Sequence, residues 1–469
     1  MEACVLALIG MTAALANGCE LVLGPMVWSY ACIATAVAIC LATRNNHQLD
    51  IFGPMITITA YLAFLFGIRG IFVLSFDPYY FMPYATPGLI STALALATTG
   101  MIATYCGYCL QLGDRIADLI PIPAFLWAGE RQYPNIVILG AAAVGLGGLA
   151  LFVAIGGGHK GIDVTSSAGT FWITPMINLL PFSLLMLVLN SKRHWLTPRR
   201  VLAACILASG VLAAFLIFSS KLFVVETVFV GLVAYHYRVK RLRIASAVVL
   251  IFASFVAMQC SKLYLSLYTY NISMMLSNLT QSWNSLWMQL FSRFYGLDSM
   301  VAILIHTRRI HYEWGSSFAE LLYWWIPRAI WPNKPFSWSY QFSYILHKYN
   351  SADAGSFSAP TFLGELYLNF GLVGLIIGSV LAGIAARAAY VYFVGRVPSK
   401  SSLLMYGLVL VHLGQLCEST LAVAVALSLA HILPLSAFLI CTRYIEFYRT
   451  RGELYCLVQT NAMRKASNI

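Results

Sequence analysis

Apolar runs of about 20 residues recur along this chain of 469 residues, and they constrain its fold more than any other feature. The sequence is 60% hydrophobic and only 10% charged, with a mean hydropathy of +0.78. Soluble chains are nearer half apolar and a quarter charged, so a soluble enzyme is excluded. The alternation typical of an outer-membrane barrel does not occur. We therefore predict an all-α, polytopic membrane protein.

The apolar runs predict about 12 transmembrane helices, and the shortest runs leave counts of 11 and 13 open. One long polar break interrupts them. We predict a membrane bundle over 1–261, a structured outer loop over 262–365, three more spans over 366–441 and a basic cytoplasmic tail over 442–469. The expected spans are 3–17, 21–42, 52–75, 88–112, 136–157, 171–190, 201–218, 222–236, 244–261, 366–394, 402–417 and 420–441.

Lysine and arginine are distributed unevenly among the short loops, which indicates the orientation because cytoplasmic loops are enriched in both. With the C-terminus in the cytoplasm, 19 of the 29 basic residues lie inside, and only Lys160 and Lys221 lie in short outer loops. The net charge of +12 therefore reflects topology rather than a nucleic-acid surface. The same orientation places the long loop outside.

Four ionisable residues fall inside predicted spans, where a charge is costly and usually faces a cavity or a partner. They are Arg69, Glu226, His412 and Glu418. Arg69 and Glu226 lie near the outer ends of their spans. Each could reach to the membrane surface or line an outward cavity, and for Arg69 we favour the cavity.

The long loop is rich in aromatic residues, which a disordered linker lacks. Residues 281–306 are predicted to form a helix, and residues 316–325 a short amphipathic one. Pro327, Pro332 and Pro335 then break the chain. Aromatic rings stack on sugar faces, and arginine holds phosphate by paired hydrogen bonds. The loop is therefore predicted to form a cap lined by sugar-binding and phosphate-binding side chains.

A simpler alternative for the loop is an interfacial belt of aromatic residues with basic anchors. Such a belt needs no prolines, no acidic residues such as Asp298 and Glu313, and no adjacent arginines such as Arg308 and Arg309. We therefore prefer the cap.

Residues 326–335, Ile-Pro-Arg-Ala-Ile-Trp-Pro-Asn-Lys-Pro, resemble the "PR-x-x-WP-x-KP" element of Wzy-type oligosaccharide repeat-unit polymerases. Upstream, residues 293–298 read Arg-Phe-Tyr-Gly-Leu-Asp, similar to the Arg…Asp helix of that family. Downstream, residues 360–371 contain Glu-Leu-Tyr-Leu-Asn-Phe-Gly, which is similar to its "E-x-Y-x-N-x-G" segment. The resemblance covers about residues 290–375.

The resemblance implies a multi-span, lipid-dependent glycosyltransferase (an architecture like that of the GT-C class) in the bacterial inner membrane. It would transfer a growing glycan from undecaprenyl diphosphate to the acceptor hydroxyl of an incoming lipid-linked unit at the periplasmic face. The implied partners are that lipid-linked oligosaccharide, membrane lipids and a polysaccharide chain-length regulator. No nucleic acid and no cofactor are implied.

That reaction needs three kinds of group. The loop has no DxD-type metal pair, so basic side chains, without a metal, must neutralise the leaving diphosphate. The acceptor hydroxyl needs a general base, and the sugars need aromatic or amide contacts. The candidates are Arg328, Lys334, Arg293, Arg308, Arg309 and Arg69 for the diphosphate, Asp298, His311, Glu313 and Glu365 for catalysis, and Trp314, Trp331, Tyr295 and Asn369 for sugar binding.

Structural roles are open for several of these candidates. Asp298 could simply pair with a nearby arginine. Glu365 and Asn369 could cap the helix that begins beside them, where a carboxylate suits the helix dipole. His306 is expected to lie at the surface.

Two other functions share parts of this pattern. A ligase that moves finished polymer from the same lipid to another acceptor would have the same fold and topology. A polysaccharide flippase would place its charged residues in the middle of several spans and have short outer loops, the opposite of this chain. An ATP-driven transporter is disfavoured because no GxxxxGK[ST] motif occurs.

The bias in basic residues predicts the side of each loop. A reporter fused after Tyr349 should be periplasmic, whereas reporters fused after Lys240 and Ile469 should be cytoplasmic. Paired phosphatase and fluorescent-protein fusions measure this directly. A cytoplasmic Tyr349 fusion would overturn the orientation, and with it a reaction on lipid-linked units outside the cell.

Overall fold

Within the residues that the structure describes, every regular element is helical, which confirms the all-α class. The structure is a computed structural model. It describes residues 24–44, 49–76, 85–129, 132–154, 173, 175–190, 198–218, 222–243, 246, 294–309, 311–326, 330–335, 338, 342 and 360–466.

Seven helical segments in these ranges are long and apolar enough to cross a membrane, which supports membrane embedding. They coincide with seven of the predicted spans. Four are single helices: α2 (Pro25–Ala42), α5 (Pro87–Cys109), α7 (Asn135–Ala154) and α19 (Lys400–Glu418). Two are composite: Pro54–Ser75 runs through α3 (Pro54–Leu62), η1 (Ala63–Ile68) and α4 (Arg69–Phe76), and Phe362–Arg396 runs through α18 (Phe362–Tyr390) and η4 (Val391–Arg396). The last, Leu421–Arg449, is the first part of α20 (Leu421–Ala466).

The other five predicted spans are not established as membrane crossings. Three of them form helices that miss that criterion of length and apolarity, namely α9 (Leu179–Leu189), α10 (Pro198–Phe218) and α11 (Leu222–Arg238). The span predicted over 3–17, and all but residue 246 of the one over 244–261, lie outside the described residues. The shorter elements are α6 (Leu112–Leu119), η2 (Ala124–Trp127), α15 (Gly296–Arg309) and α16 (Glu320–Tyr323).

Local sequence explains where the long helices begin. Helices α2, α3 and α5 each start with proline, whose fixed φ and missing N–H suit the first helical position. The side chains of Thr86, Thr361 and Ser399 accept hydrogen bonds from backbone amides in the first turns of α5, α18 and α19. These caps satisfy amides that would otherwise have no partner. The start of each span is therefore set by one or two residues.

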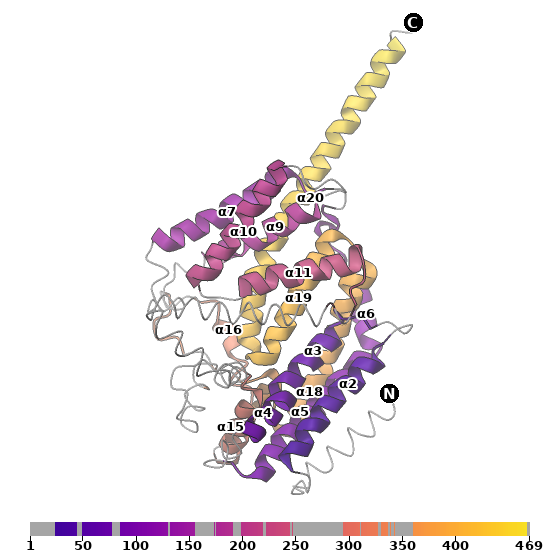
Figure 1. The fold of residues 1–469 in the computed structure, drawn as a ribbon. Helices are drawn as coiled ribbons and strands as arrows, with labels where there is room; N and C mark the ends of the chain where they lie inside the picture. Colours follow the sequence, from indigo (N-terminus) through magenta and orange to yellow (C-terminus); the bar gives the residue numbers. More distant parts are fainter. Residues whose placement is uncertain are drawn as a thin grey trace.

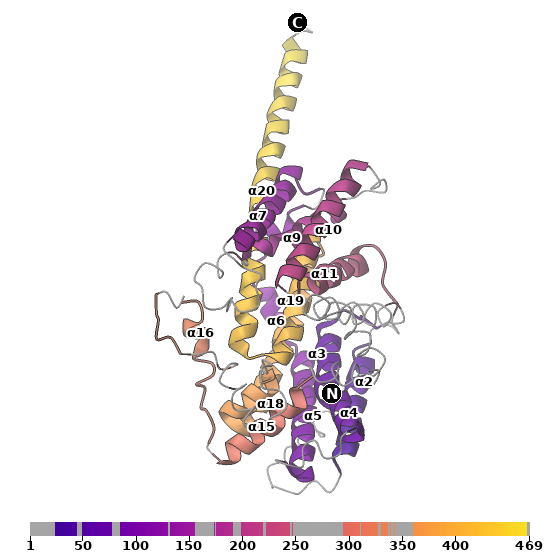
Figure 2. The same ribbon diagram turned by 60° about the vertical axis from the view of Figure 1, so that its left-hand side comes forward.

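Helices α5 and α18 approach closely through glycine. A Cβ added to Gly107 would collide with the backbone carbonyl of Val380, and one added to Gly383 would collide with that of Thr104. Small residues let backbones approach in a membrane bundle, where lipid tails are as apolar as leucine. Helix α5 is buried along most of its length, between α2, α3 and α18 (Figures 1 and 2).

Helix α18 is kinked. Phe370 and Gly371 have backbone angles outside the helical region. Gly374 and Gly378 have the spacing of a helix–helix contact, but they face Phe370 and Leu366 of the same helix across the kink. The kink therefore separates a short first half, 362–369, from the longer apolar half that crosses α5.

A partly buried carboxylate joins α3, α11 and α18 at another level of the bundle. Asp50, just before α3, accepts hydrogen bonds from the hydroxyls of Tyr237 at 2.7 Å and Tyr390 at 2.7 Å, and His236 Nε2 lies 3.3 Å away. Burial alone would raise the pKa of Asp50. The hydrogen bonds from His236, Tyr390 and Tyr237 outweigh burial and hold this pKa below its usual value.

Helix α20 is 46 residues long and projects past the other helices (Figures 1 and 2). The segment predicted as a basic tail, 442–469, is thus helical as far as Ala466. Helix α11 packs on α19, and α19 packs on α20, so these three helices form a second part of the bundle beside α5 and α18.

The glycine contact between α5 and α18 predicts a stability effect. Gly107→Ala should lower the free energy of unfolding by about 1–3 kcal/mol, because the new Cβ overlaps the Val380 backbone. Gly147→Ala in α7 is the matched control, since a Cβ there meets nothing within 4 Å. The control should be neutral or stabilising by about 0.5–1 kcal/mol, as alanine favours a helix over glycine. Reversible unfolding in detergent micelles measures both, and equal effects would contradict the contact.

Candidate functional site

The loop after α15 is fastened to the start of α18 by a buried polar cluster, which we call the loop anchor and which consists of Ser317, Glu365 and Asn369. The Ser317 hydroxyl donates to Glu365 Oε1 at 2.8 Å, and Asn369 Nδ2 donates to Ser317 Oγ at 2.7 Å. The backbone amide of Leu421 donates to Glu365 Oε2 at 2.6 Å. All three side chains of the anchor are at most 2% exposed. The anchor therefore joins the loop, α18 and α20.

Glu365 thus caps helix α20, whereas the sequence predicted that it could cap the helix that begins beside it, which is α18. Leu421 is the first residue of α20, and a carboxylate at a helix N-terminus is favourable. Helix α18 is instead capped by its own Thr361. Both Glu365 oxygens are occupied by protein donors, so Glu365 supports the site rather than receiving a substrate proton.

The backbone of the loop also pairs with α18. The amides of Glu313 and Trp314 donate to the carbonyls of Leu368 at 3.0 Å and Asn369 at 3.2 Å, and Gly315 N–H donates to Asn369 Oδ1 at 2.8 Å. Trp314 and Gly315 take positive φ values of 47° and 92°. A positive φ is costly for tryptophan, so the contacts with α18 must stabilise it. The result is a Trp314 ring that is 74% exposed.

The kink in α18 fits the loop. Gly371 has a φ of 64°, and a Cβ there would lie 3.0 Å from the Tyr312 ring. The Tyr312 ring also contacts the rings of Trp314 and Tyr367 edge to face. Glycine at position 371 therefore permits both the turn and the approach of the aromatic loop.

Arg69 and Asp298 form a buried ion pair. Arg69 Nε lies 3.0 Å from Asp298 Oδ2, and Nη2 lies 3.1 Å from Oδ1, so the contact is bidentate. The two residues are 4% and 3% exposed. The Arg69 guanidinium also lies 5.7 Å from the centre of the Tyr295 ring. The structural role left open for Asp298, pairing with an arginine, is therefore what the geometry shows.

Glu313 is the candidate base with both exposure and a titratable neighbour. Its side chain is 27% exposed, Oε1 lies 3.5 Å from His306 Nε2, and Oε2 accepts a hydrogen bond from Ser316 at 2.8 Å. His306 is 7% exposed, so the expectation that it lies at the surface is wrong. Its place on the inward face of α15 explains the burial. His311 is exposed.

A buried acid that the sequence did not single out lies deeper in the loop. Glu320 is 5% exposed and accepts a hydrogen bond from the backbone amide of Trp338 at 2.9 Å. Burial raises its pKa above the usual value for glutamate. No motif pointed to Glu320, since its role depends on contact with a residue 18 positions away.

Lys334 lies near the end of residues 326–335, the segment that resembles the polymerase element, and binds the residues at and before its start. Its ammonium donates to the carbonyls of Trp324 at 2.7 Å and Ile326 at 3.0 Å, and it lies 5.9 Å from the centre of the Tyr323 ring. The Trp331 ring packs edge to face on Tyr323 and is 38% exposed. Lys334 thus has a structural task, and its predicted contact with a diphosphate stays a prediction.

The predicted loop helices differ from the structure where their residues are described. Helix α15 covers Gly296–Arg309, while the start of the predicted helix 281–306 lies outside the described residues. The amphipathic helix predicted over 316–325 is wrong, because only Glu320–Tyr323 are helical and turns surround them. The contacts of 313–315 and of the Ser317 side chain with α18 hold the turns that precede these four residues. Helix α16 lies beside α20 (Figure 2).

The remaining basic candidates are only partly located. Arg308 is exposed near the end of α15. Arg293 and Arg328 lie outside the described residues, as does the side chain of Arg309. Their predicted contacts with a diphosphate therefore stay predictions.

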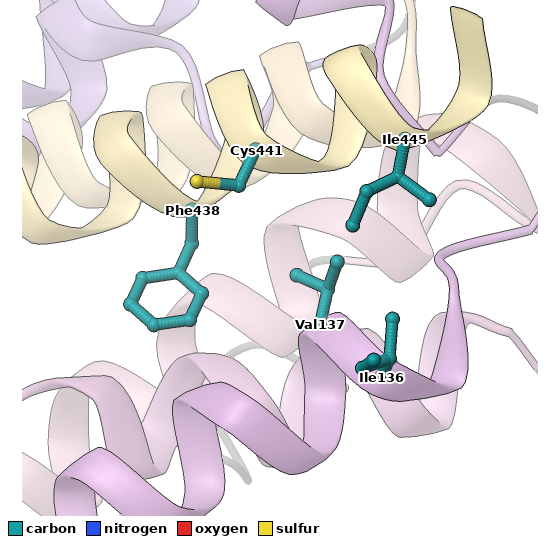
Figure 3. Close-up of a pocket in the computed structure, with 5 residues that line it drawn as sticks. All are labelled: Ile136, Val137, Phe438, Cys441 and Ile445. Atoms are coloured by element: carbon teal, nitrogen blue, oxygen red, sulfur yellow. The ribbon is translucent and has the colours of Figure 1, made fainter. Parts of the chain in front are cut away.

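An apolar hollow of about 180 Å³ lies between α7 and α20, away from the loop. Figure 3 shows Phe438, Cys441 and Ile445 of α20 facing Ile136 and Val137 at the start of α7. It offers no charged or hydrogen-bonding side chain. It therefore contributes nothing to the chemistry of the site.

Comparison of the chain with models of known protein families, with curated proteins and with solved structures finds no match.

The buried Arg69–Asp298 pair should contribute much more to the free energy of unfolding than the more exposed Arg387–Asp114 pair, although both are close contacts. Asp298→Asn should lower the free energy of unfolding by about 3–5 kcal/mol, because it removes the carboxylate charge that pairs bidentately with the buried Arg69 guanidinium. The control is Asp114→Asn, since Asp114 pairs with Arg387 at 2.7 Å but the two side chains are 40% and 33% exposed. That change should cost about 1 kcal/mol or less.

The double variant Arg69→Met with Asp298→Leu tests the same interpretation in the opposite direction. Replacing both charges by apolar groups should restore most of the stability lost by the single variant. Unfolding in detergent micelles measures all three variants. A double variant as unstable as Asp298→Asn would contradict the ion-pair interpretation.

Proposed function

We propose that this chain is a polymerase of lipid-linked oligosaccharide repeat units. It would transfer a growing glycan from undecaprenyl diphosphate to the acceptor hydroxyl of an incoming lipid-linked unit, at the periplasmic face of the bacterial inner membrane and without a metal. The resemblance of residues 290–375 to Wzy-type polymerases motivates the proposal. A chain-length regulator is the expected protein partner.

One observation supports the proposal most. Two of the stretches that carry the resemblance, 293–298 and 360–371, meet because α15 packs on α18. The loop between them pairs with α18 at Glu313, Trp314 and Gly315, and the anchor residues Glu365 and Asn369 hold it. A belt of interfacial aromatic residues requires no such pairing. A sugar-binding cap does require such pairing, because bound sugars need aromatic rings in defined positions.

The geometry narrows the choice of general base. Asp298 is committed to Arg69, and Glu365 to Ser317 and Leu421. Of Glu313 and His311, which are both left, we assign the base to Glu313, which is partly exposed, directly precedes Trp314 and has His306 beside it. In this assignment Glu313 takes the proton of the acceptor hydroxyl while Trp314, and further along the loop Trp331, contact sugar.

Stabilisation of the leaving diphosphate falls to arginine in this proposal. Arg328 follows Ile326, whose carbonyl is bound by Lys334, so the residues before and after Arg328 are tied together. A guanidinium can bind two phosphate oxygens at once. Arg308 and Arg293 are the further candidates, and Arg69 is less suited because Asp298 already pairs with it.

The decisive experiment uses the purified full-length chain in lipid nanodiscs with undecaprenyl-diphosphate-linked glycans extracted from a strain that lacks the gene. A ladder of lipid-linked products, with release of undecaprenyl diphosphate, is expected. Glu313→Gln should give no ladder. Transfer of whole polymer to a lipid A core without extension would establish the ligase instead. Movement of the glycan across a vesicle membrane without new bonds would establish a flippase.

Arg328 is predicted to be the basic residue that the reaction tolerates losing least. Arg328→Ala should lower the rate of chain extension by roughly 30- to 1000-fold, the effect of losing one charge-assisted contact to a leaving group. Arg328→Lys should also retain little activity, because lysine keeps the charge but loses the paired donors. Lys334→Ala should have a smaller effect. Extension assays at matched protein amounts measure this, and near wild-type turnover in Arg328→Ala would shift the role to Arg293.

A further inference from the structure

A second buried polar cluster lies in the membrane bundle, which we call the histidine cluster: Glu226 of α11, His412 of α19 and His431 of α20. One carboxylate oxygen and one ring nitrogen from each histidine all lie within 4.8 Å of one another. The three residues are 1%, 4% and 3% exposed. His431 lies ten residues after Leu421, so the cluster is about 15 Å along α20 from the loop anchor.

Neighbouring groups orient the two imidazoles. Gln415 Oε1 lies 2.7 Å from His412 Nδ1, and because a carbonyl oxygen only accepts, His412 Nδ1 carries the proton. The lone pair of His412 Nε2 then points to His431 Nδ1, 3.2 Å away. The rings are inclined by 23° with centres 5.0 Å apart. A histidine held by a carbonyl on its outer nitrogen is typical of a metal ligand.

Glu226 is the group that the protein leaves unsatisfied. Its Oε1 is buried without a hydrogen-bond partner, and its Oε2 lies 3.6 Å from His431 Nε2. That distance is longer than the roughly 2.7–3.2 Å of a hydrogen bond. Metal–ligand distances of about 2.0–2.2 Å place two ligands of one ion about 3–3.5 Å apart. The 3.6 Å between Glu226 Oε2 and His431 Nε2 is close to that separation, and one ligand atom from each of the three residues lies within 4.8 Å of the other two.

We propose that Glu226, His412 and His431 bind one divalent first-row transition-metal ion of the zinc type. Two imidazoles and a carboxylate are suitable ligands for such ions, and the cation would compensate the buried carboxylate. Because each ligand comes from a different helix, the ion would tie α11, α19 and α20 together. The site is separate from the loop, so it adds a structural metal to the bundle and leaves the proposed reaction unchanged.

The test uses full-length protein without a histidine tag, purified with chelator, equilibrated with Zn²⁺ or Co²⁺ and freed of unbound metal. Elemental analysis should find one ion per chain, and Co²⁺ should give the visible absorption of nitrogen and oxygen ligation. Zn²⁺ should also raise the midpoint of thermal unfolding in a saturable way that chelator reverses. This last readout needs no variant.

Variants assign the ion to the histidine cluster. Glu226→Gln, His412→Gln and His431→Gln should each lose stoichiometric binding, whereas His311→Gln, at an exposed histidine of the loop, should retain it. Gln415→Leu should weaken affinity by about 10- to 100-fold, since it removes only the group that orients His412.

Two results would overturn the site. One is that the wild-type protein retains no more metal than the variant with all three residues changed to glutamine. The three side chains would then share a proton instead of binding an ion. The other is metal that remains bound in His431→Gln and is lost in His311→Gln, which would place the ion at the surface.

Discussion

Both oxygens of the Glu365 carboxylate accept hydrogen bonds, and the arrangement of the loop, α18 and α20 depends on this interaction. A carboxylate removed from water is costly unless donors satisfy it, and Glu365 finds them in Ser317 and in the first amide of α20. These two donors belong to segments far apart in the chain. Satisfying one charge therefore fixes the loop, α18 and α20 at one point, one turn from the carbonyls of Leu368 and Asn369 that bind the amides of Glu313 and Trp314.

Burial divides the acidic candidates by role. Asp298 and Glu365 are at most 3% exposed, and each has both oxygens engaged by protein donors. Such groups organise a site, because releasing either one to accept a proton would strand its partner in a dry environment. Glu313 has one oxygen near a histidine and is partly exposed, so an acceptor hydroxyl could come within hydrogen-bond reach of it.

Hydropathy located seven spans because a long apolar run has essentially one stable arrangement in a membrane, a helix. The loop was harder to predict. Residues 316–325 have the periodicity of an amphipathic helix, but only Glu320–Tyr323 are helical. The residues just before them, 313–315, pair with Leu368 and Asn369, and no local pattern encodes those partners. The same limit explains the histidine cluster. Glu226 and His412 stand out as ionisable residues in apolar runs, whereas their meeting with His431 depends on how α11, α19 and α20 pack.

Two kinds of contact hold the helices, and they act at different places. In lipid, apolar surface alone barely distinguishes a helix neighbour from an acyl chain, so specific contacts must select the arrangement. Helices α5 and α18 use close approach at Gly107 and Gly383. Helix α20 uses polar contacts instead, at Leu421 and at His431. Since α18 carries both Gly383 and Glu365, it links the glycine-packed half to the polar half. A displacement of α18 against α5 would therefore move the loop anchor and the side chains of the candidate site with it.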